Sequence, residues 1–267
     1  MSGVLVTPLE LGLAALLVLA MAGSSVALQL NIGRRIIIAA IRTAIQLTLL
    51  GLVLKTLFAQ THWGWVAVMG MVMLLAAGRE ATQRQSRRFS GWWSFGIGLS
   101  AMFVSSFVIT LLVLWTVVTP TPWYTPQYAI PLLGITLGNT LNGIALGLDR
   151  LTQGAWQNRL MIETRLASGE PWPEALLEIK REAVRTGTIP MLNAMAAAGI
   201  VSLPGMMTGQ ILAGADPVQA VNYQILIMFM VSAGSGFGTM LAVHMGAKRL
   251  FDERHRLRLD RLGPGNA

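Results

Sequence analysis

Basic residues are concentrated in this sequence in four short clusters, which are separated by long runs with almost no charge. Eighteen of the twenty lysines and arginines belong to the clusters: Arg34 and Arg35; Arg79, Arg84, Arg87 and Arg88; Arg150, Arg159, Arg165, Lys180, Arg181 and Arg185; and Lys248, Arg249, Arg254, Arg256, Arg258 and Arg261. A polar group left unsatisfied in hydrocarbon is costly, so chains cross a bilayer as apolar helices of about 20 residues. Loops rich in Lys and Arg stay on the cytoplasmic side. The pattern therefore predicts an all-α, polytopic membrane protein.

The apolar runs between the clusters predict about seven transmembrane helices. They cover residues 9–30, 36–59, 63–77, 92–119, 128–148, 188–213 and 218–245. With the N-terminus outside and the C-terminus cytoplasmic, every basic cluster lies on one side of the membrane. The external connections, 60–62, 120–127 and 214–217, then contain no Lys or Arg. No long linker or internal repeat interrupts the chain, so we expect one transmembrane domain over residues 1–267.

Composition argues against several other classes of protein. Hydrophobic residues make up 54% of the chain and charged residues 12%, which is about half the charged share of a soluble domain. The net charge of +8 comes from the predicted cytoplasmic loops, and no aromatic residues alternate with it, which argues against nucleic-acid binding. The chain has no cysteine and no phosphate-binding loop of the form GxxxxGK followed by Ser or Thr. We therefore expect no thiolate metal site, no catalytic centre and no ATP bound by this chain.

Polar side chains within two of the predicted spans are candidates for a transport pathway. Arg42 lies two helical turns after Arg34 in the second span, and Gln46 follows one turn later on the same face. Arg42 either reaches back to the cytoplasmic interface or faces a pathway or subunit contact. Asn139 and Asn142 lie near the middle of the fifth span. Their carboxamides either bond a neighbouring helix or meet a substrate.

The sixth predicted span should break or kink near its middle. Pro204 removes a backbone hydrogen bond there, and Gly205 follows it. Irregular backbone at membrane depth is tolerated only where it is buried in protein or lines a cavity. Methionines and one glutamine surround the predicted break: Met191, Met195, Met206, Met207 and Gln210. The methionines are either flexible packing residues or soft thioether contacts for a metal ion.

Residues 149–187 form the one sizeable cytoplasmic connection. Two helical stretches are predicted there, separated by Ser168, Gly169, Glu170 and Pro171. The second stretch places Leu176, Ile179 and Ala183 on one face, which is typical of a helix lying on a membrane surface or docking a soluble partner. The connection holds six basic and six acidic residues, and this balance favours a protein partner over anionic lipid.

Four sequence segments resemble the FetB-type ABC transporter permeases. They are IRTAIQLTLLGLVL (41–54), PLLGITLGNTLNG (131–143), ETRLASGEPWPEAL (163–176) and GIVSLPGMMTGQILAGADPVQAVNYQI (199–225). Bacterial members of that family are linked to iron export, and plant relatives to aluminium tolerance. The resemblance implies a homodimer in the plasma (inner) membrane that carries two copies of a separate FetA-like ATP-binding subunit. ATP would then be bound by the partner, and no cofactor by this chain.

The resemblance also implies which residues contact the ATP-binding subunit, because the LASG…EA stretch (166–175) is similar to the coupling-helix region of ABC permeases, and we expect residues 163–185 to dock that subunit. The implied coupling residues are Glu163, Leu166, Ala167, Gly169, Glu174, Arg181 and Arg185.

These observations favour a permease subunit that exports a metal ion, with iron as the best candidate. The expected pathway residues are Arg42, Gln46, Asn139, Asn142, Met195, Pro204, Gly205, Met206, Met207 and Gln210, and Met195, Met206 and Met207 would contact the metal transiently. An alternative is a secondary transporter or channel driven by an ion gradient. That class predicts intramembrane carboxylates, and the central predicted spans contain none. A membrane scaffold without transport activity would leave the broken sixth span without a purpose.

Overall fold

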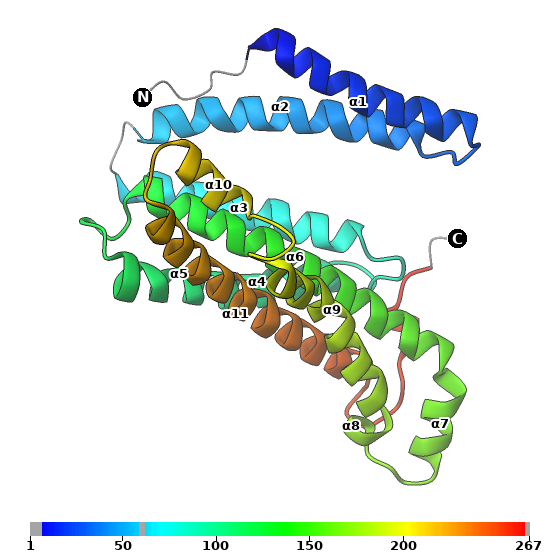
Figure 1. Ribbon diagram of the computed structural model, residues 1–267. Helices are drawn as coiled ribbons and strands as arrows, with labels where there is room; N and C mark the ends of the chain where they lie inside the picture. Colours follow the sequence, from blue (N-terminus) through cyan, green and yellow to red (C-terminus); the bar gives the residue numbers. More distant parts are fainter. Residues whose placement is uncertain (1–6, 59–61, 265–267) are drawn as a thin grey trace. The chain divides into compact units, whose positions relative to one another are not determined.

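The computed structural model describes residues 7–58 and 62–264, which are helical apart from short connections and three isolated β-bridges (Figure 1). The described residues divide into two compact units, and each is treated by itself. The first unit comprises residues 7–58 and 212–215, and the second comprises residues 62–211 and 216–264. The all-α class predicted from the sequence is confirmed, whereas the single domain stays a prediction.

The first unit is a helical hairpin. Helix α1 (Pro8–Ala27) begins at Thr7, whose hydroxyl accepts from the Glu10 N–H while the Glu10 carboxylate accepts from the Thr7 N–H. This reciprocal pair satisfies two of the free N–H groups at the helix start. A short turn leads to α2 (Gly33–Phe58). Most side chains of the hairpin are exposed and apolar, as expected for helices that face lipid.

The second unit is a bundle built around one long helix, α6 (Pro126–Gln157) (Figure 1). Around it pack α3 (Trp63–Gln83), α4 (Trp93–Met102), α9 (Leu177–Ala197) and α11 (Pro217–Arg249). From α4 the chain continues through the π-helical turn η1 (Phe103–Phe107), α5 (Val108–Val113) and a second π-helical turn, η2 (Leu114–Val118). The fully buried side chains Ile144, Leu148 and Leu151 of α6 form the centre of the core.

Six helical segments in the described part of the chain are long and apolar enough to cross a membrane: 9–27, 33–58, 63–83, 93–118, 126–157 and 217–249. They match six of the seven predicted spans. Several continue beyond the apolar runs because a helix keeps its backbone hydrogen bonds after it leaves the hydrocarbon; α6, for example, extends nine residues past the predicted end at Leu148. The seventh crossing and the orientation of the termini stay predictions.

The remaining predicted span, residues 188–213, is interrupted as the sequence indicated. Helix α9 ends at Ala197, and α10 (Gly205–Leu212) begins directly after Pro204. The interruption starts earlier than the proline, because Ala198 is extended and Gly199 has a φ of +80°, a conformation that favours glycine. Backbone hydrogen bonds close the turn, among them one of 2.9 Å from the Gly199 N–H to the Ser202 carbonyl.

Helices α6, α9 and α11 approach closely where glycines face one another. A Cβ atom added at Gly143 of α6 would lie 2.5 Å from Thr239 Oγ1, 2.7 Å from Ser235 Oγ and 3.1 Å from the Gly187 carbonyl of α9. Such contact between small residues is a main source of helix association in lipid, where no hydrophobic effect drives the helices together.

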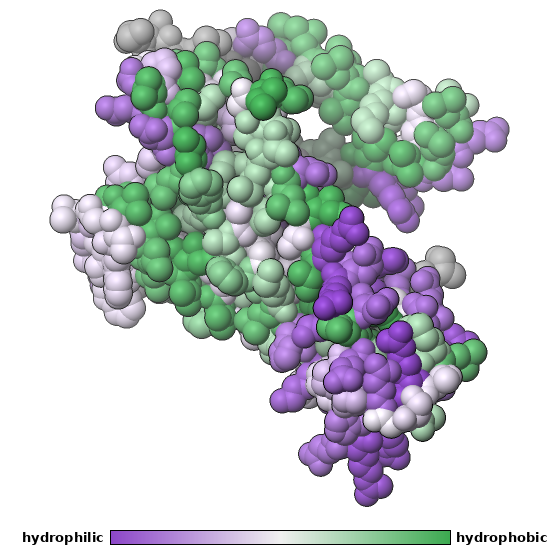
Figure 2. Space-filling view, turned by 60° about the horizontal axis from the view of Figure 1, so that its bottom comes forward, coloured by the Kyte–Doolittle hydropathy of each residue, from purple (hydrophilic) through white to green (hydrophobic). Residues whose placement is uncertain are grey.

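The polar end of the second unit is built from α7 (Arg159–Ala167), α8 (Trp172–Ala175) and the segment after α11. The predicted loop between the two helical stretches, residues 168–171, is confirmed. Leu176, Ile179 and Ala183 are buried. Because α9 packs along α6 over this stretch, the predicted apolar face is covered by protein and does not lie on a membrane surface. Figure 2 shows hydrophilic side chains gathered at this end of the second unit, away from its apolar helices.

Candidate functional site

A cavity of about 200 Å³ lies beside the interruption between α9 and α10. Its lining comes from four helices and the residues of the interruption: Ile135, Asn139, Met191, Ala194, Pro204, Gly205, Met206, Gln224, Ile227, Met228, Val231 and Ser232. All of these residues belong to the second unit. The structure therefore brings four of the predicted pathway residues together: Asn139, Pro204, Gly205 and Met206.

Gln224 is the most informative residue of this cavity, and it was not among the residues predicted from the sequence. Its side chain is 9% exposed, and its Oε1 atom has no hydrogen-bond donor among the described residues. A buried carboxamide oxygen without a partner is costly and rare in folded proteins. The sequence offered a signal for it, because Gln224 is a polar residue followed by seven apolar residues in the last predicted span.

The methionines that line the cavity differ from Met195, Met206 and Met207, which were predicted to contact a metal ion. Met191, Met206 and Met228 line it. Met195 lies next to it, since its sulfur accepts a hydrogen bond of 2.9 Å from the hydroxyl of the lining residue Ser232. Met207 is buried but does not line the cavity. Side chains at successive positions of one helix point in directions about 100° apart, and on α10 it is Met206 that faces the cavity while Met207 is buried elsewhere.

The two asparagines of α6 have separate surroundings. Asn139 lines the cavity, and its Nδ2 group donates to the Ile135 carbonyl at 2.9 Å, which leaves its Oδ1 atom available. The Oδ1 atom of Asn142 accepts a hydrogen bond of 2.6 Å from Arg84 Nη1 at the end of α3. Asn142 thus serves a helix–helix contact, which was the alternative considered for it.

Three other predicted pathway residues do not line this cavity. Gln210, on α10, is half-buried outside it. Arg42 and Gln46 have exposed side chains on α2. Since α2 belongs to the first unit, their part in a pathway stays a prediction.

The cavity can offer only neutral ligands to a solute. Its polar and polarisable groups are three thioethers, two carboxamides and one hydroxyl, and no carboxylate or histidine is among its lining residues. No group of three or more His, Asp or Glu side chains comes together elsewhere in residues 7–58 and 62–264. Thioether sulfur suits soft metal ions, and carboxamide oxygen suits harder ones. Neutral ligands of both kinds would hold a cation weakly.

A groove of about 590 Å³ lies at the polar end of the second unit. It is lined by Glu163, Leu166, Ala167, Gly169, Glu170, Pro171, Arg254, His255, Arg256 and Leu257. Four of the predicted coupling residues, Glu163, Leu166, Ala167 and Gly169, therefore face one groove. The other three, Glu174, Arg181 and Arg185, are exposed and lie outside it.

The opposite wall of this groove, residues 254–257, was not predicted. Asp252 holds it in place, since its carboxylate accepts from the backbone N–H groups of Arg256 and Arg254 and pairs with the Arg256 guanidinium at 2.8 Å. The hydrogen bond from the Arg256 backbone N–H is the largest of the causes that lower the pKa of Asp252 from 3.8 to about 2. Trp172 joins the wall to α8, stacking on Phe251 and donating its backbone N–H to His255 Nδ1 at 3.4 Å.

These features define the class of protein, a multi-pass helical membrane protein with a cavity beside a broken helix and a groove at its polar end. The chain belongs to the uncharacterised protein family UPF0014, whose profile matches residues 8–251. The resemblance to the FetB-type permeases, predicted above from four segments, is confirmed by this family match together with the relatives that follow.

Three relatives show which proteins the chain is similar to. A UPF0014 membrane protein of Synechocystis is 34% identical over 85% of this chain and 87% of the relative. Protein ALUMINUM SENSITIVE 3 of Arabidopsis thaliana is 30% identical over 81% of this chain and 77% of its own length. The probable iron export permease protein FetB of Escherichia coli is 29% identical over 81% of both chains. No solved structure matches the chain.

Proposed function

We propose that this chain is the permease subunit of an ABC transporter that exports a metal ion, with iron as the favoured cargo. Its similarity to the probable iron export permease FetB extends over 81% of both chains, and the family match over residues 8–251 includes every residue that lines the cavity. The chain would form the membrane passage as a homodimer in the inner membrane. A separate FetA-like ATP-binding subunit would hydrolyse ATP.

The single structural observation that carries the proposal is the unpaired Oε1 atom of Gln224 in a cavity beside a broken helix. A stable protein usually pairs such an atom with a donor or with water. A passing cation would satisfy it, together with Asn139 Oδ1 and the nearby thioethers. Weak, neutral coordination suits an exporter, because a tightly bound ion would not be released.

The groove supports the second half of the proposal, coupling to an ATP-binding subunit. It presents both carboxylates and guanidinium groups: Glu163 and Glu170 on one wall, Arg254 and Arg256 on the other. A protein surface with alternating charge can complement such a groove, whereas an anionic lipid surface would be repelled by the acidic wall.

The proposal is tested by measuring iron efflux from iron-loaded cells that lack their own exporter. We expect efflux when this chain is produced together with its ATP-binding partner, and none with a partner whose Walker lysine is replaced by alanine. Efflux that persists with the inactive partner and stops when an ionophore collapses the ion gradients would contradict the proposal and favour a secondary transporter.

A further inference from the structure

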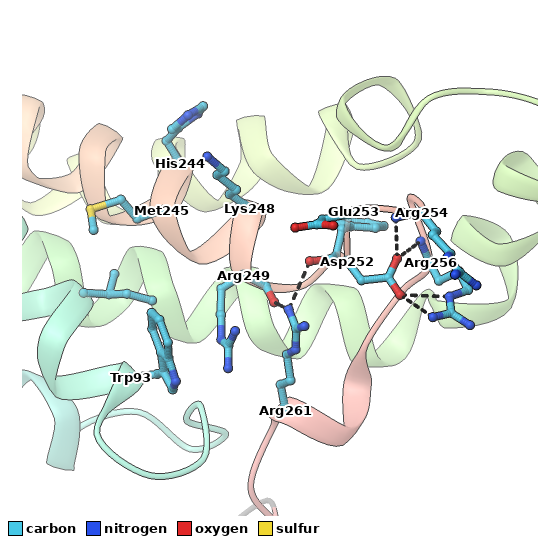
Figure 3. A pocket seen from close by; sticks show the side chains of 12 residues that line it. Trp93, His244, Met245, Lys248, Arg249, Asp252, Glu253, Arg254, Arg256 and Arg261 are labelled. Atoms are coloured by element: carbon cyan, nitrogen blue, oxygen red, sulfur yellow. Dashed lines mark hydrogen bonds and ion pairs between the residues drawn. The ribbon is translucent and has the colours of Figure 1, made fainter.

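A second, larger cavity of about 890 Å³ lies where two of the apolar helical segments, α4 and α11, meet the segment that follows α11. It is lined by Trp93, Ile97, His244, Met245, Lys248, Arg249, Phe251, Asp252, Glu253, Arg254, Arg256 and Arg261 (Figure 3). The predicted apolar runs 92–119 and 218–245 begin and end beside it, so we expect the cavity to lie at the boundary between hydrocarbon and water. The 83% exposed side chain of Trp92 is consistent with that position, because tryptophan is enriched at this boundary.

The cavity carries a net positive charge that is not neutralised by its own acidic residues. Five Lys and Arg side chains and two carboxylates line it. Asp252 is bound by Arg256 at 2.8 Å. Within residues 7–58 and 62–264, no carboxylate forms an ion pair with Lys248, Arg249 or Arg261. An anion that entered would therefore meet unpaired cations.

Arg249 is the cation best placed to receive an anion. Its guanidinium lies over the Trp93 ring, with Cζ 3.9 Å from the ring centroid. Its Nε–H is buried and has no acceptor among the described residues. Figure 3 shows Arg249 between Trp93 and Arg261. The stacked ring fixes the orientation of the guanidinium, and an orphaned donor in a basic cavity indicates that an acceptor is missing.

The carbonyl groups at the end of α11 would ordinarily repel an anion at this place. Here one of them is covered, because Arg261 Nη1 donates to the Arg249 carbonyl at 2.8 Å; the same group also donates to the Phe251 carbonyl, two residues after the helix, at 3.0 Å. Arg261 thus reduces the negative potential at the end of the helix and adds a positive charge.

Apart from the charged groups and His244, whose Nδ1 lies 3.2 Å from Lys180 Nζ, the lining of the cavity is apolar. Ile97 and Met245 extend this apolar lining toward the hydrocarbon side, next to the Trp93 ring. A small water-soluble anion makes no favourable contact with this apolar lining, whereas the acyl chains of a phospholipid can pack against it below the phosphate. Basic cavities between helices at the cytoplasmic face are known to hold anionic lipid headgroups.

We propose that this cavity binds an anionic phospholipid of the leaflet that the basic clusters face, with its phosphate at Lys248, Arg249 and Arg261 and its acyl chain along Trp93, Ile97 and Met245. The inference does not depend on the transported cargo. It places a bound lipid in the cavity that α4, α11 and the segment after α11 line in the second unit.

Native mass spectrometry of the full chain in detergent tests the proposal, with phosphatidylglycerol compared against phosphatidylcholine of the same chain length. We expect selective retention of phosphatidylglycerol by the parent. The double variant Lys248→Gln/Arg249→Gln should retain about thirtyfold less, since each of the two basic residues near a membrane surface contributes on the order of 1 kcal/mol. The control Arg34→Gln/Arg35→Gln removes the same charge from exposed positions at the start of α2, outside the cavity, and should retain phosphatidylglycerol like the parent. Equal retention by the parent and the cavity variant would overturn the proposal, and so would complete displacement of the lipid by inorganic phosphate.

A second measurement avoids any effect of the double variant on folding. Phosphatidylglycerol with brominated acyl chains should quench the tryptophan fluorescence of the parent more than brominated phosphatidylcholine does. Trp93→Phe should remove this difference, because Trp93 is the tryptophan that lines the cavity. An undiminished difference in Trp93→Phe would place the bound lipid elsewhere and contradict the assignment.

Discussion

At the scale of single residues, replacing Gln224 tests whether its carboxamide binds the transported ion or only stabilises the fold. Replacing an unpaired buried carboxamide by leucine removes a desolvation cost of about 1–3 kcal/mol. We therefore expect Gln224→Leu to unfold in detergent at the same or a higher temperature than the parent while its iron efflux falls. The control is Thr239→Val, which removes another buried, unpaired oxygen outside the cavity and should leave efflux unchanged. A Gln224→Leu variant that exports iron like the parent would remove Gln224 from the pathway.

The three lining methionines can be tested as a set. Replacing Met by Leu keeps the volume and usually costs less than about 1.5 kcal/mol per site. We expect the triple variant at Met191, Met206 and Met228 to lose export while it remains folded. The matched control replaces Met71, Met161 and Met240, which are exposed outside the cavity. Similar efflux from the two triple variants would show that the methionines of the cavity are packing residues.

At the scale of the helices, the crossing of α6 with α9 and α11 depends on the absence of a side chain. Gly143→Ala should lower the free energy of unfolding by about 1–3 kcal/mol, because the added methyl group has to displace Thr239, Ser235 or the backbone of α9. Gly138→Ala is the control on the same helix. A Cβ atom there meets nothing within 4 Å, so the variant should be as stable as the parent or up to about 1 kcal/mol more stable. Thermal unfolding in detergent measures both, and a neutral Gly143→Ala would contradict this packing.

The groove at the polar end allows an equally matched test of docking. Gly169 and Gly91 are both exposed loop glycines with positive φ, +91° and +65°, and both have open space at the Cβ position. A tryptophan should cause similar backbone strain at either place, but only Gly169 lines the groove. We expect Gly169→Trp to abolish copurification of the ATP-binding partner and Gly91→Trp to preserve it. Normal copurification with Gly169→Trp would exclude the groove as the docking surface.

At the scale of the whole molecule, the placement of the basic clusters predicts the orientation of the chain. Reporter fusions at Gln127 and Gly263 should report opposite sides of the membrane, with Gly263 in the cytoplasm. The reason is that the segment around Gln127 contains no Lys or Arg, whereas Gly263 follows the last basic cluster. Reports from the same side would overturn the predicted orientation.

Features that depend on local sequence were predicted correctly. The positions of the helices, the break near Pro204 and the loop at Gly169 all follow from apolar runs and from the backbone limits of proline and glycine. Features that depend on helix rotation and long-range contact were not predicted. Sequence spacing could not show that Met228 and Gln224 of α11 would share a cavity with Met206, or that Asn142 would bind Arg84 instead of lining it. Nor could it show that residues 254–257 would complete the groove, because their position is set by Asp252 and Trp172.

The wall formed by residues 254–257 has a consequence for biogenesis. This segment follows α11, the last of the membrane-spanning helices in residues 7–58 and 62–264, and therefore leaves the ribosome after α11 has been made. Until then the groove has one wall only, and a chain that is truncated or still being inserted offers no complete surface to a soluble subunit. Recruitment of the ATP-binding subunit would thereby be restricted to chains whose synthesis has passed the last membrane helix, which delays assembly until the passage through the membrane is in place.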